Sequence, residues 1–433
     1  MKAGRVLLGC VLLSTLLAHG EQAAKDFFFR DKDSVVFLGD SITEQKLYTT
    51  YVEAYTLTRF PKQAFTFRNV GWGGDTAWLR QRAHPNEKEL FAADGSALDE
   101  MVTKAVGAGL ARDVLPLKPT AVTVDFSMND HAYQAFRPDI FRAHVRSQKE
   151  IATVLTKNGA RVALMTTQPI EEKRPDPDKD IKNLSLGKFS DGIKEVAAKE
   201  GVRFVDQFNP YMALMMKARA TNPEAVIGGG DKVHPGPAGH TLMAWMILKG
   251  LNAPALVSCG CIDVSRGWFS SKVVCHKNCE ISRVKVADGV VSFDRLDAAL
   301  PMPIDTRAVA ALQIAPVTDE LNRYGLKVAG LTAGSYDLVI DGQKVATLTK
   351  EDLEKGFNLA TVSTPNSVQA LKVLDLVFKK NAAYFERWRK VQLANGPAEK
   401  LAQLDKQIAD FEAQINIART PAIHHFELKP VAK

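Results

Sequence analysis

Short apolar segments alternate with longer amphipathic segments over residues 34–250. The short segments are rich in β-branched or aromatic residues, as buried strands are. They are residues 34–38, 65–70, 120–126, 161–167 and 202–205. Helical patterns lie between them, for example at 141–155 and 189–199. Strands separated by helices predict a parallel sheet with helices on both faces, and ligand sites in such sheets lie at the carboxyl ends of the strands.

The pattern changes near residue 251. Asp288-Gly289 and Asp341-Gly342 each separate two short β-like runs. Asp-Gly pairs favour the type I′ turns of two-residue hairpins. These hairpins predict a small β-rich domain over residues 251–363.

A helical region follows. Thr364-Pro365 is a typical helix start, because proline suits the first helical position. Asn395-Gly396-Pro397 interrupts this region, and apolar residues then recur at spacings of three and four. They are Leu401, Leu404, Ile408, Phe411 and Ile415. Residues 364–433 are therefore predicted to form a helical hairpin, packed against the rest of the protein, and a tail.

Polar motifs follow the first three predicted strands, and a fourth lies in a loop before a late helix. They are Gly39-Asp40-Ser41-Ile42, Asn69-Val70-Gly71-Trp72-Gly73-Gly74-Asp75-Thr76, Ser127-Met128-Asn129-Asp130 and Asp231-Lys232-Val233-His234. We expect these motifs to meet where the strands end. Ser41 and Glu44 also fit a capping box, in which Ser41 would do no more than begin a helix.

Acyl transfer is the chemistry that these residue types support. The Ser41 hydroxyl is a weak nucleophile and needs a base, for which His234 is the candidate. Asp231 can orient the imidazole and stabilise its charged form. An oxyanion needs several donors aimed at one point. The candidates are the N–H groups of Ser41 and Gly74 and the side-chain amide of Asn129.

The four motifs together resemble the SGNH (GDSL-type) hydrolases, whose name lists the Ser, Gly, Asn and His of these blocks. The resemblance covers residues 34–250, about half of the chain. It implies a flavodoxin-like three-layer α/β/α fold, no cofactor and hydrolysis of esters. One position departs from the family pattern, because Ser127 stands where the third block usually has glycine. The overall layout, with its additional C-terminal regions, resembles that of secreted GDSL-type proteins from polysaccharide-degrading bacteria.

These features predict a secreted serine esterase that removes acyl groups, in particular O-acetyl groups, from carbohydrate. Two alternatives are a lipid or thioester acyl hydrolase and a non-catalytic carbohydrate-binding protein on the same fold. Trp72 and Tyr133 lie within or just after the motifs and are candidates for stacking on a sugar, although packing in the core or at the rim is the simpler role for both. His131 is expected to face solvent, and no role is assigned to the other histidines outside the motifs.

Composition adds few constraints. The 433 residues carry a formal charge of +7 that is spread along the chain, and no motif indicates a nucleic-acid partner. No metal-protease motif or phosphate-binding loop is present, so neither a metal nor a cofactor is predicted.

The N-terminus resembles a signal peptide. Lys2 and Arg5 precede a short apolar run, and small residues follow at candidate cleavage positions. We predict removal of residues 1–24, a hydrolase domain over 25–250, no later membrane segment, and a secreted or periplasmic location.

The remaining cysteines lie close together in the β-rich region. They are Cys259, Cys261, Cys275 and Cys279. In a secreted protein such a cluster favours disulfides over a zinc site, and the spacing leaves all three pairings open.

Overall fold

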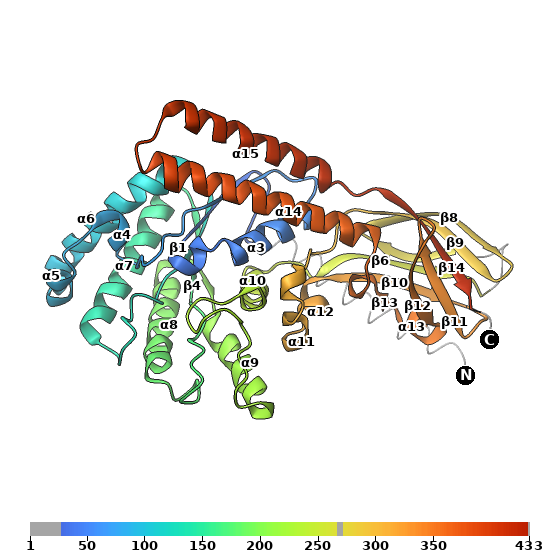
Figure 1. Cartoon of the computed structure of the whole chain (residues 1–433), viewed down its shortest axis with the longest axis horizontal. Helices are drawn as coiled ribbons and strands as arrows, with labels where there is room; N and C mark the ends of the chain where they lie inside the picture. Colours follow the sequence, from blue (N-terminus) through green and yellow to red (C-terminus); the bar gives the residue numbers. More distant parts are fainter. Residues whose placement is uncertain (1–26, 266–271, 432–433) are drawn as a thin grey trace.

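The computed structural model describes residues 27–265 and 272–431. The predicted signal peptide lies outside them. Figure 1 shows a helix-covered sheet on one side and a β-rich region on the other, with α14 (Pro365–Phe385) and α15 (Ala398–Ala418) running along the molecule above the sheet. The three parts of the predicted fold are confirmed. No helix of the described residues combines the length and the apolar character needed to cross a membrane.

The first region is built on a parallel sheet of five strands. They are β1 (Asp33–Gly39), β2 (Phe65–Asn69), β3 (Ala121–Asp125), β4 (Arg161–Met165) and β5 (Arg203–Val205). Their order in the sheet is β2-β1-β3-β4-β5, with every pair parallel. The strands follow the apolar segments to within two residues at either end.

Helices cover both faces of this sheet. They are α2 (Ser41–Glu44), α3 (Leu47–Arg59), α4 (Arg80–Ala83), α5 (Glu87–Ala92), α6 (Gly95–Asp113), the 3₁₀ turn η1 (Leu115–Leu117), α7 (Pro138–Lys157), α8 (Ile181–Glu200), α9 (Phe208–Thr221) and α10 (Pro237–Gly250). Successive residues of β1 enter different cores: Phe37 packs in the core that contains α3 and α10, and Leu38 in the core that contains α6 and α7. This alternation is the three-layer α/β/α arrangement.

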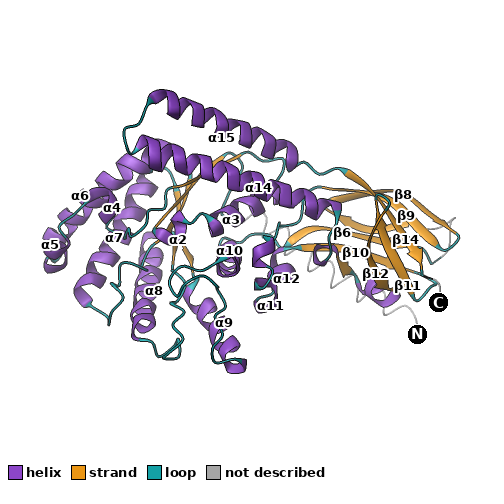
Figure 2. Cartoon of the chain, in the orientation of Figure 1, coloured by secondary structure: helices purple, strands orange, loops and turns teal. Residues whose placement is uncertain are grey.

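The β-rich region contains two sheets, drawn in orange in Figure 2. Their strands are β6 (Leu256–Asp263), β7 (Lys272–Lys277), β8 (Cys279–Ala287), β9 (Val290–Asp297), β10 (Arg323–Ala329), β11 (Ser335–Ile340), β12 (Gln343–Thr349), β13 (Phe357–Asn358) and β14 (Ile423–Pro430). The sheet orders are β13-β10-β6-β7 and β12-β11-β14-β9-β8. Both predicted hairpins form, and Asp288, Gly289, Asp341 and Gly342 all have the positive φ that a type I′ turn requires.

Short helices connect these strands, some of them packed in the core that contains α10, and a π-helical segment links the two long helices. They are η2 (Thr306–Ala308), α11 (Ala311–Ile314), α12 (Val317–Leu321), α13 (Lys350–Lys355), η3 (Leu359–Thr361) and η4 (Glu386–Gln392). The sequence predicts that the chain ends in a tail after the helical hairpin. The end of the chain instead forms β14, which lies between β11 and β9 and buries Phe426 and Leu428 in the β-rich core.

The helical hairpin is fixed to the hydrolase region by buried polar contacts. Lys380 Nζ of α14 lies 2.6 Å from Glu53 Oε1 of α3, and both side chains are almost fully buried. Asn381 Nδ2 donates to the other oxygen of Glu53 at 3.0 Å and to Thr50 Oγ1 at 2.9 Å. A buried charge is costly unless it is paired, so these contacts hold α14 against α3.

The cysteine cluster contains one disulfide, between Cys261 and Cys275. The expectation of disulfides is therefore confirmed for this pair and wrong for Cys259 and Cys279, which are free thiols. The Cys279 thiol instead donates to the Cys259 carbonyl at 3.3 Å. Within residues 27–265 and 272–431, no cluster of His, Cys, Asp or Glu side chains could hold a metal ion.

Candidate active site

Ser41 is the first residue of helix α2, directly after strand β1. The predicted capping box is wrong, because Asp40 is the N-cap and its carboxylate accepts from Ile42 N at 2.9 Å. Glu44 does not reach back to the cap, since its Oε2 accepts from Gly73 N at 3.0 Å. Capping by Asp40 leaves the Ser41 side chain free to point away from the helix start.

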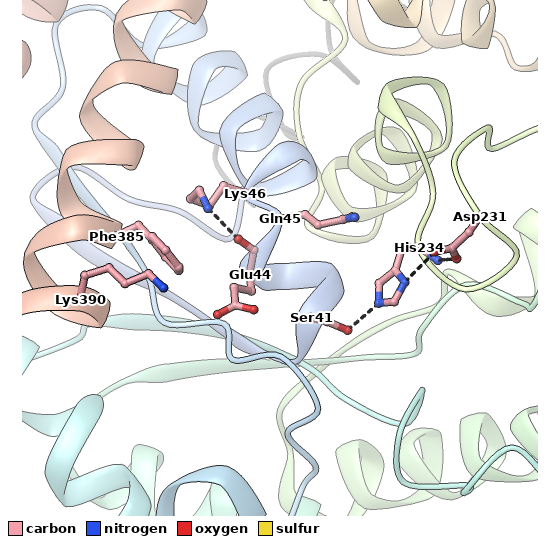
Figure 3. A pocket seen from close by; sticks show the side chains of 8 residues that line it. All are labelled: Ser41, Glu44, Gln45, Lys46, Asp231, His234, Phe385 and Lys390. Atoms are coloured by element: carbon pink, nitrogen blue, oxygen red, sulfur yellow. Dashed lines mark hydrogen bonds and ion pairs between the residues drawn. The ribbon is translucent and has the colours of Figure 1, made fainter. Parts of the chain in front are cut away.

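His234 reaches Ser41 from the loop before α10. Its Nε2 lies 2.9 Å from Ser41 Oγ, and its Nδ1 lies 3.1 Å from Asp231 Oδ2. Figure 3 shows the three side chains in a row, with the imidazole between the hydroxyl and the carboxylate. The structure therefore brings together the three residues that the sequence predicts as nucleophile, base and orienting acid.

The loop that carries Asp231 and His234 holds itself in shape. Asp231 Oδ1 accepts from the backbone N–H groups of Val233 and His234, both at 2.7 Å. Gly230 has φ +73°, and a Cβ there would lie 2.3 Å from the His234 carbonyl oxygen, so only glycine fits. Burial acts to raise the pKa of Asp231, but the hydrogen bonds from the His234 and Val233 backbone and the His234 ring outweigh it and lower this pKa. The carboxylate is thereby kept charged beside the imidazole.

The other motifs lie beside Ser41. A Cβ on Gly73 would be 4.0 Å from Ser41 Cβ, so the glycine-rich turn runs past the serine. Gly74 has φ +75°, a conformation that glycine adopts without strain. Asn129 Nδ2 donates to the Asp75 carbonyl at 3.0 Å, which ties the third motif to the residue after Gly74. One N–H of the Asn129 amide is used in this bond, and the amide has a second one to offer.

Tyr133 contacts the same amide. Its hydroxyl donates to Asn129 Oδ1 at 3.3 Å, which fixes the orientation in which Nδ2 faces Asp75. Burial, with the nearby negative charge of Asp40 second, raises the pKa of Tyr133 to about 12, so the hydroxyl keeps its proton. Tyr133 thus contacts a predicted oxyanion donor directly.

Trp72 has other neighbours. The Arg389 guanidinium lies 3.7 Å from its ring centroid, and the Trp388 ring packs edge-on at 6.0 Å. The guanidinium of Arg112 lies 5.1 Å from the ring. Protein groups therefore occupy the surroundings of this ring, and the contacts favour packing over sugar stacking.

His131 does not face solvent as expected. It is 2% exposed and its Nδ1 lies 3.1 Å from the Ser127 carbonyl. Burial lowers the pKa of His131 to about 4, so the ring is neutral at pH 7.

Ser127 keeps the backbone shape of the glycine it replaces. Its φ is 114°, and its N–H donates to Asp130 Oδ2 at 3.2 Å. Asp130 Oδ1 also accepts from Ala77 N at 3.0 Å, which joins the second and third motifs. The turn therefore survives the substitution, with serine in a region of backbone space that favours glycine.

Two buried carboxyl groups lie near the turn between β1 and α2. Asp40 precedes Ser41, and Asp125 ends strand β3 opposite Gly39. Burial, with the charge of Asp125 second, raises the pKa of Asp40 well above its usual range. Burial also raises the pKa of Asp125 to about 7, although a hydrogen bond from Gln207 opposes the shift.

A pocket of about 510 Å³ opens in front of Ser41. Its lining consists of Ser41, Glu44, Gln45, Lys46, Asp231, His234, Phe385 and Lys390. Figure 3 shows His234 and Asp231 on one side and Phe385, Lys390 and Lys46 on the other. The sequence analysis missed the second side, because Phe385 and Lys390 are more than 300 residues from Ser41 and belong to no motif.

Residues 37–242 match the model of the GDSL-like Lipase/Acylhydrolase family, so this part of the chain is a domain of that family. The protein is accordingly an ester-hydrolysing enzyme of the acylhydrolase class. No curated protein matches the sequence.

Several solved structures are similar. A gut microbial diltiazem-metabolizing enzyme aligns over 93% of this chain and 98% of its own, with a TM-score of 0.77 and 24% identity. The acetylxylan esterase Axe2 of Geobacillus stearothermophilus aligns over 52% of this chain and 96% of its own (TM-score 0.39, 20% identity). LAE5, from the metagenome of Lake Arreo, aligns over 52% and 98% (TM-score 0.39, 19% identity). The first of these shows that the whole three-part fold occurs in a solved structure.

Proposed function

We propose that the protein hydrolyses acyl esters, in particular O-acetyl esters of carbohydrates, with Ser41 as nucleophile. The observation that carries this proposal is the row formed by Ser41, His234 and Asp231, with contacts of 2.9 and 3.1 Å. The His234 side chain is 35% exposed, so a substrate can reach the base without any rearrangement of the loop.

In the first step, Ser41 Oγ attacks the ester carbonyl carbon while His234 Nε2 takes the hydroxyl proton. Asp231 holds the imidazole by its other nitrogen and stabilises the positive charge that forms. The tetrahedral oxyanion receives hydrogen bonds from Ser41 N, Gly74 N and Asn129 Nδ2. His234 then returns the proton to the departing alcohol, and the acyl group stays on Ser41.

Water completes the cycle. His234 takes a proton from a water molecule, the resulting hydroxide attacks the acyl carbonyl, and Ser41 leaves with the proton. The products are the alcohol and the carboxylic acid. No cofactor is needed for either half of this reaction.

The carbohydrate substrate is supported by the residues around the nucleophile. The wall opposite His234 carries Lys46 and Lys390 rather than a continuous apolar surface, which suits a polar alcohol better than a long acyl chain. A lipid or thioester hydrolase is the alternative within enzymes. We also infer that the protein is secreted or periplasmic, from the signal-like N-terminus and the disulfide between Cys261 and Cys275.

Activity-based labelling tests the nucleophile. A fluorophosphonate should label the wild type and the control Ser96→Ala, which removes an exposed serine of α6, but not Ser41→Ala. Asn129→Ala should be folded and on the order of 10²-fold slower, because it removes one oxyanion donor. Labelling that persists in Ser41→Ala would show that another residue is the nucleophile. Glycan binding without labelling or hydrolysis would instead indicate the non-catalytic carbohydrate-binding protein.

Substrate class is tested by comparing p-nitrophenyl acetate with p-nitrophenyl palmitate, followed by acetate release from a panel of acetylated polysaccharides. We expect acetate to be preferred and at least one polysaccharide to be deacetylated. A preference for palmitate would favour the lipid hydrolase instead.

A further inference from the structure

The C-terminal part of the chain forms one wall of the pocket that holds Ser41. Phe385 is the last residue of α14, and Lys390 lies in the π-helical segment η4 that follows. Lys46 faces them from the loop between α2 and α3. Figure 3 shows these side chains on the side of Ser41 opposite His234. We call Lys46, Phe385 and Lys390 the cationic wall.

The two ammonium groups of this wall are arranged around one ring. Lys46 Nζ lies 4.0 Å from the Phe385 ring centroid, and Lys390 Nζ lies 5.8 Å from it. An aromatic face attracts a cation without neutralising its charge. Phe385 therefore gathers positive charge at the pocket, and because Lys46 lies over its ring, that face is closed to sugar stacking.

The nearby carboxylates are already engaged elsewhere. Glu44 accepts from Gly73 N at 3.0 Å through one oxygen, and its other oxygen lies 3.4 Å from Arg389 Nε. Asp231 is bound to His234. Among the residues that the structure describes, neither Lys46 nor Lys390 has a carboxylate oxygen within 4.0 Å, and Lys46 donates to the Glu44 backbone carbonyl at 2.9 Å.

The charge count around the pocket is therefore positive. Glu44 and Arg389 offset each other, and the charged Asp231 lies with His234 on the other side of Ser41, so one positive charge remains in excess. In the described part of the chain, neither Lys46 nor Lys390 forms an ion pair with a carboxylate, although the charge of Glu44 acts on Lys46. Burial lowers the pKa of Lys46, although the charge of Glu44 opposes the shift, which indicates that water solvates this ammonium incompletely.

We propose that the cationic wall binds a negatively charged group of the substrate, namely the carboxylate of a uronic acid at or next to the sugar that carries the acyl ester. This inference rests on the proposed esterase function and narrows its substrate class. A carboxylate would give both ammonium groups the partner they lack and would orient the ester carbonyl toward Ser41. A neutral sugar would cover the two charges without compensating them.

Two substrates that differ only in this group provide the test. They are the O-acetyl esters of methyl glucuronoside and of methyl glucoside. The wild type should hydrolyse the glucuronoside about tenfold faster in kcat/KM at low salt, and this preference should shrink in 0.5 M NaCl, where charges are screened. Lys390→Gln and Lys46→Gln should each lower kcat/KM for the glucuronoside about threefold, mainly through KM.

The control is Lys406→Gln, which removes an exposed lysine of α15 outside the pocket lining and should leave both rates unchanged. Lys390→Gln, at an exposed position, should lower kcat/KM for the glucuronoside more than for the glucoside, so that the ratio of the two values falls. Equal rates on the two esters in the wild type, or an equal loss on both in Lys390→Gln, would overturn the proposal while leaving the esterase function intact.

A binding measurement separates this proposal from the reaction itself. Calorimetry with Ser41→Ala should detect tighter binding of the acetylated glucuronoside than of the glucoside, and the difference should vanish in Ser41→Ala/Lys390→Glu. This difference in binding, if found without hydrolysis by the wild type, would support the anion site and refute the proposed function. Equal binding of the two sugars would refute the anion site.

Discussion

Asp125 makes a quantitative prediction about stability and pH. Its carboxyl group is fully buried at the end of β3, and its Oδ2 accepts from Gln207 Nε2 at 3.1 Å. Burial raises its pKa to about 7 in the folded protein. An unfolded aspartate titrates near pH 3.9. We therefore consider Asp125→Asn, which mimics the protonated carboxyl group at every pH.

The direction follows from proton binding. Between pH 4 and 7 the folded protein holds a proton on Asp125 that the unfolded chain has released, so its stability falls as the pH rises through this window. Each pKa unit corresponds to about 1.4 kcal/mol, and the shift from 3.9 to about 7 sets a ceiling near 4 kcal/mol. Relaxation around the charged group reduces this value. We expect Asp125→Asn to match the wild type at pH 4 and to exceed it by about 2–4 kcal/mol at pH 8.

The assay is urea unfolding of both proteins from pH 4 to pH 8. The other buried titratable groups, including His131 and His240, contribute to both proteins and cancel in the difference. Asp40 is the exception, because the charge of Asp125 helps to raise the pKa of Asp40. Loss of the Asp125 charge in Asp125→Asn therefore adds to the expected gain in stability. Asp410→Asn, at an exposed position of α15, is the matched control and should show no pH-dependent difference.

A difference between Asp125→Asn and wild type that stays constant from pH 4 to pH 8 would refute the reasoning. It would mean that Asp125 titrates alike in the folded and the unfolded chain. A variant that becomes less stable than wild type as the pH rises would mean that the folded protein stabilises the charged carboxylate.

Three further predictions concern single side chains. Ser127→Gly should raise the free energy of unfolding, measured in urea, by about 1 kcal/mol, because glycine adopts the φ of 114° without the backbone strain that serine has there. Tyr133→Phe should lower kcat several-fold with little change in KM, because the Asn129 amide loses the hydrogen bond that orients it. An effect on KM alone would indicate sugar stacking instead. Lys380→Met should lower the free energy of unfolding, measured in urea, by about 3–5 kcal/mol, because Glu53 is left buried without its ion pair. Adding Glu53→Gln should restore much of this stability. A loss below about 1 kcal/mol in Lys380→Met would contradict the prediction.

The sequence was informative wherever the structure depends on local pattern. The strands of the parallel sheet show as short apolar runs, and the Asp-Gly pairs identify both hairpins. Because parallel strands end at one edge, residues as distant as Ser41 and His234 could be expected to meet. The motif spacing thus predicted which side chains lie together at this edge.

Features that depend on tertiary packing were not predictable. The Ser-x-x-Glu pattern indicated a capping box, but Glu44 is drawn away from the helix start by Gly73 and Arg389. Strand β14 lies between β11 and β9, and this place depends on partners more than 80 residues earlier in the chain. The cysteine spacing allowed three pairings, and the sheet register selects Cys261 opposite Cys275.

The cationic wall shows why half of the pocket has no sequence motif. Ser41 begins helix α2 and His234 lies in the loop before α10, both at the rigid edge of the sheet, where a few fixed contacts position them. The position of Phe385 depends instead on how α14 packs on α3, and the buried Lys380–Glu53 pair fixes that packing five residues before Phe385. The hydrolase sheet thus positions the reacting groups, and the appended hairpin positions the charges that face them. Removing the hairpin would therefore expose the apolar residues beneath α14 and, at the same time, delete one wall of the pocket. Truncation thus changes folding and specificity together, whereas a single substitution at Lys390 tests specificity alone.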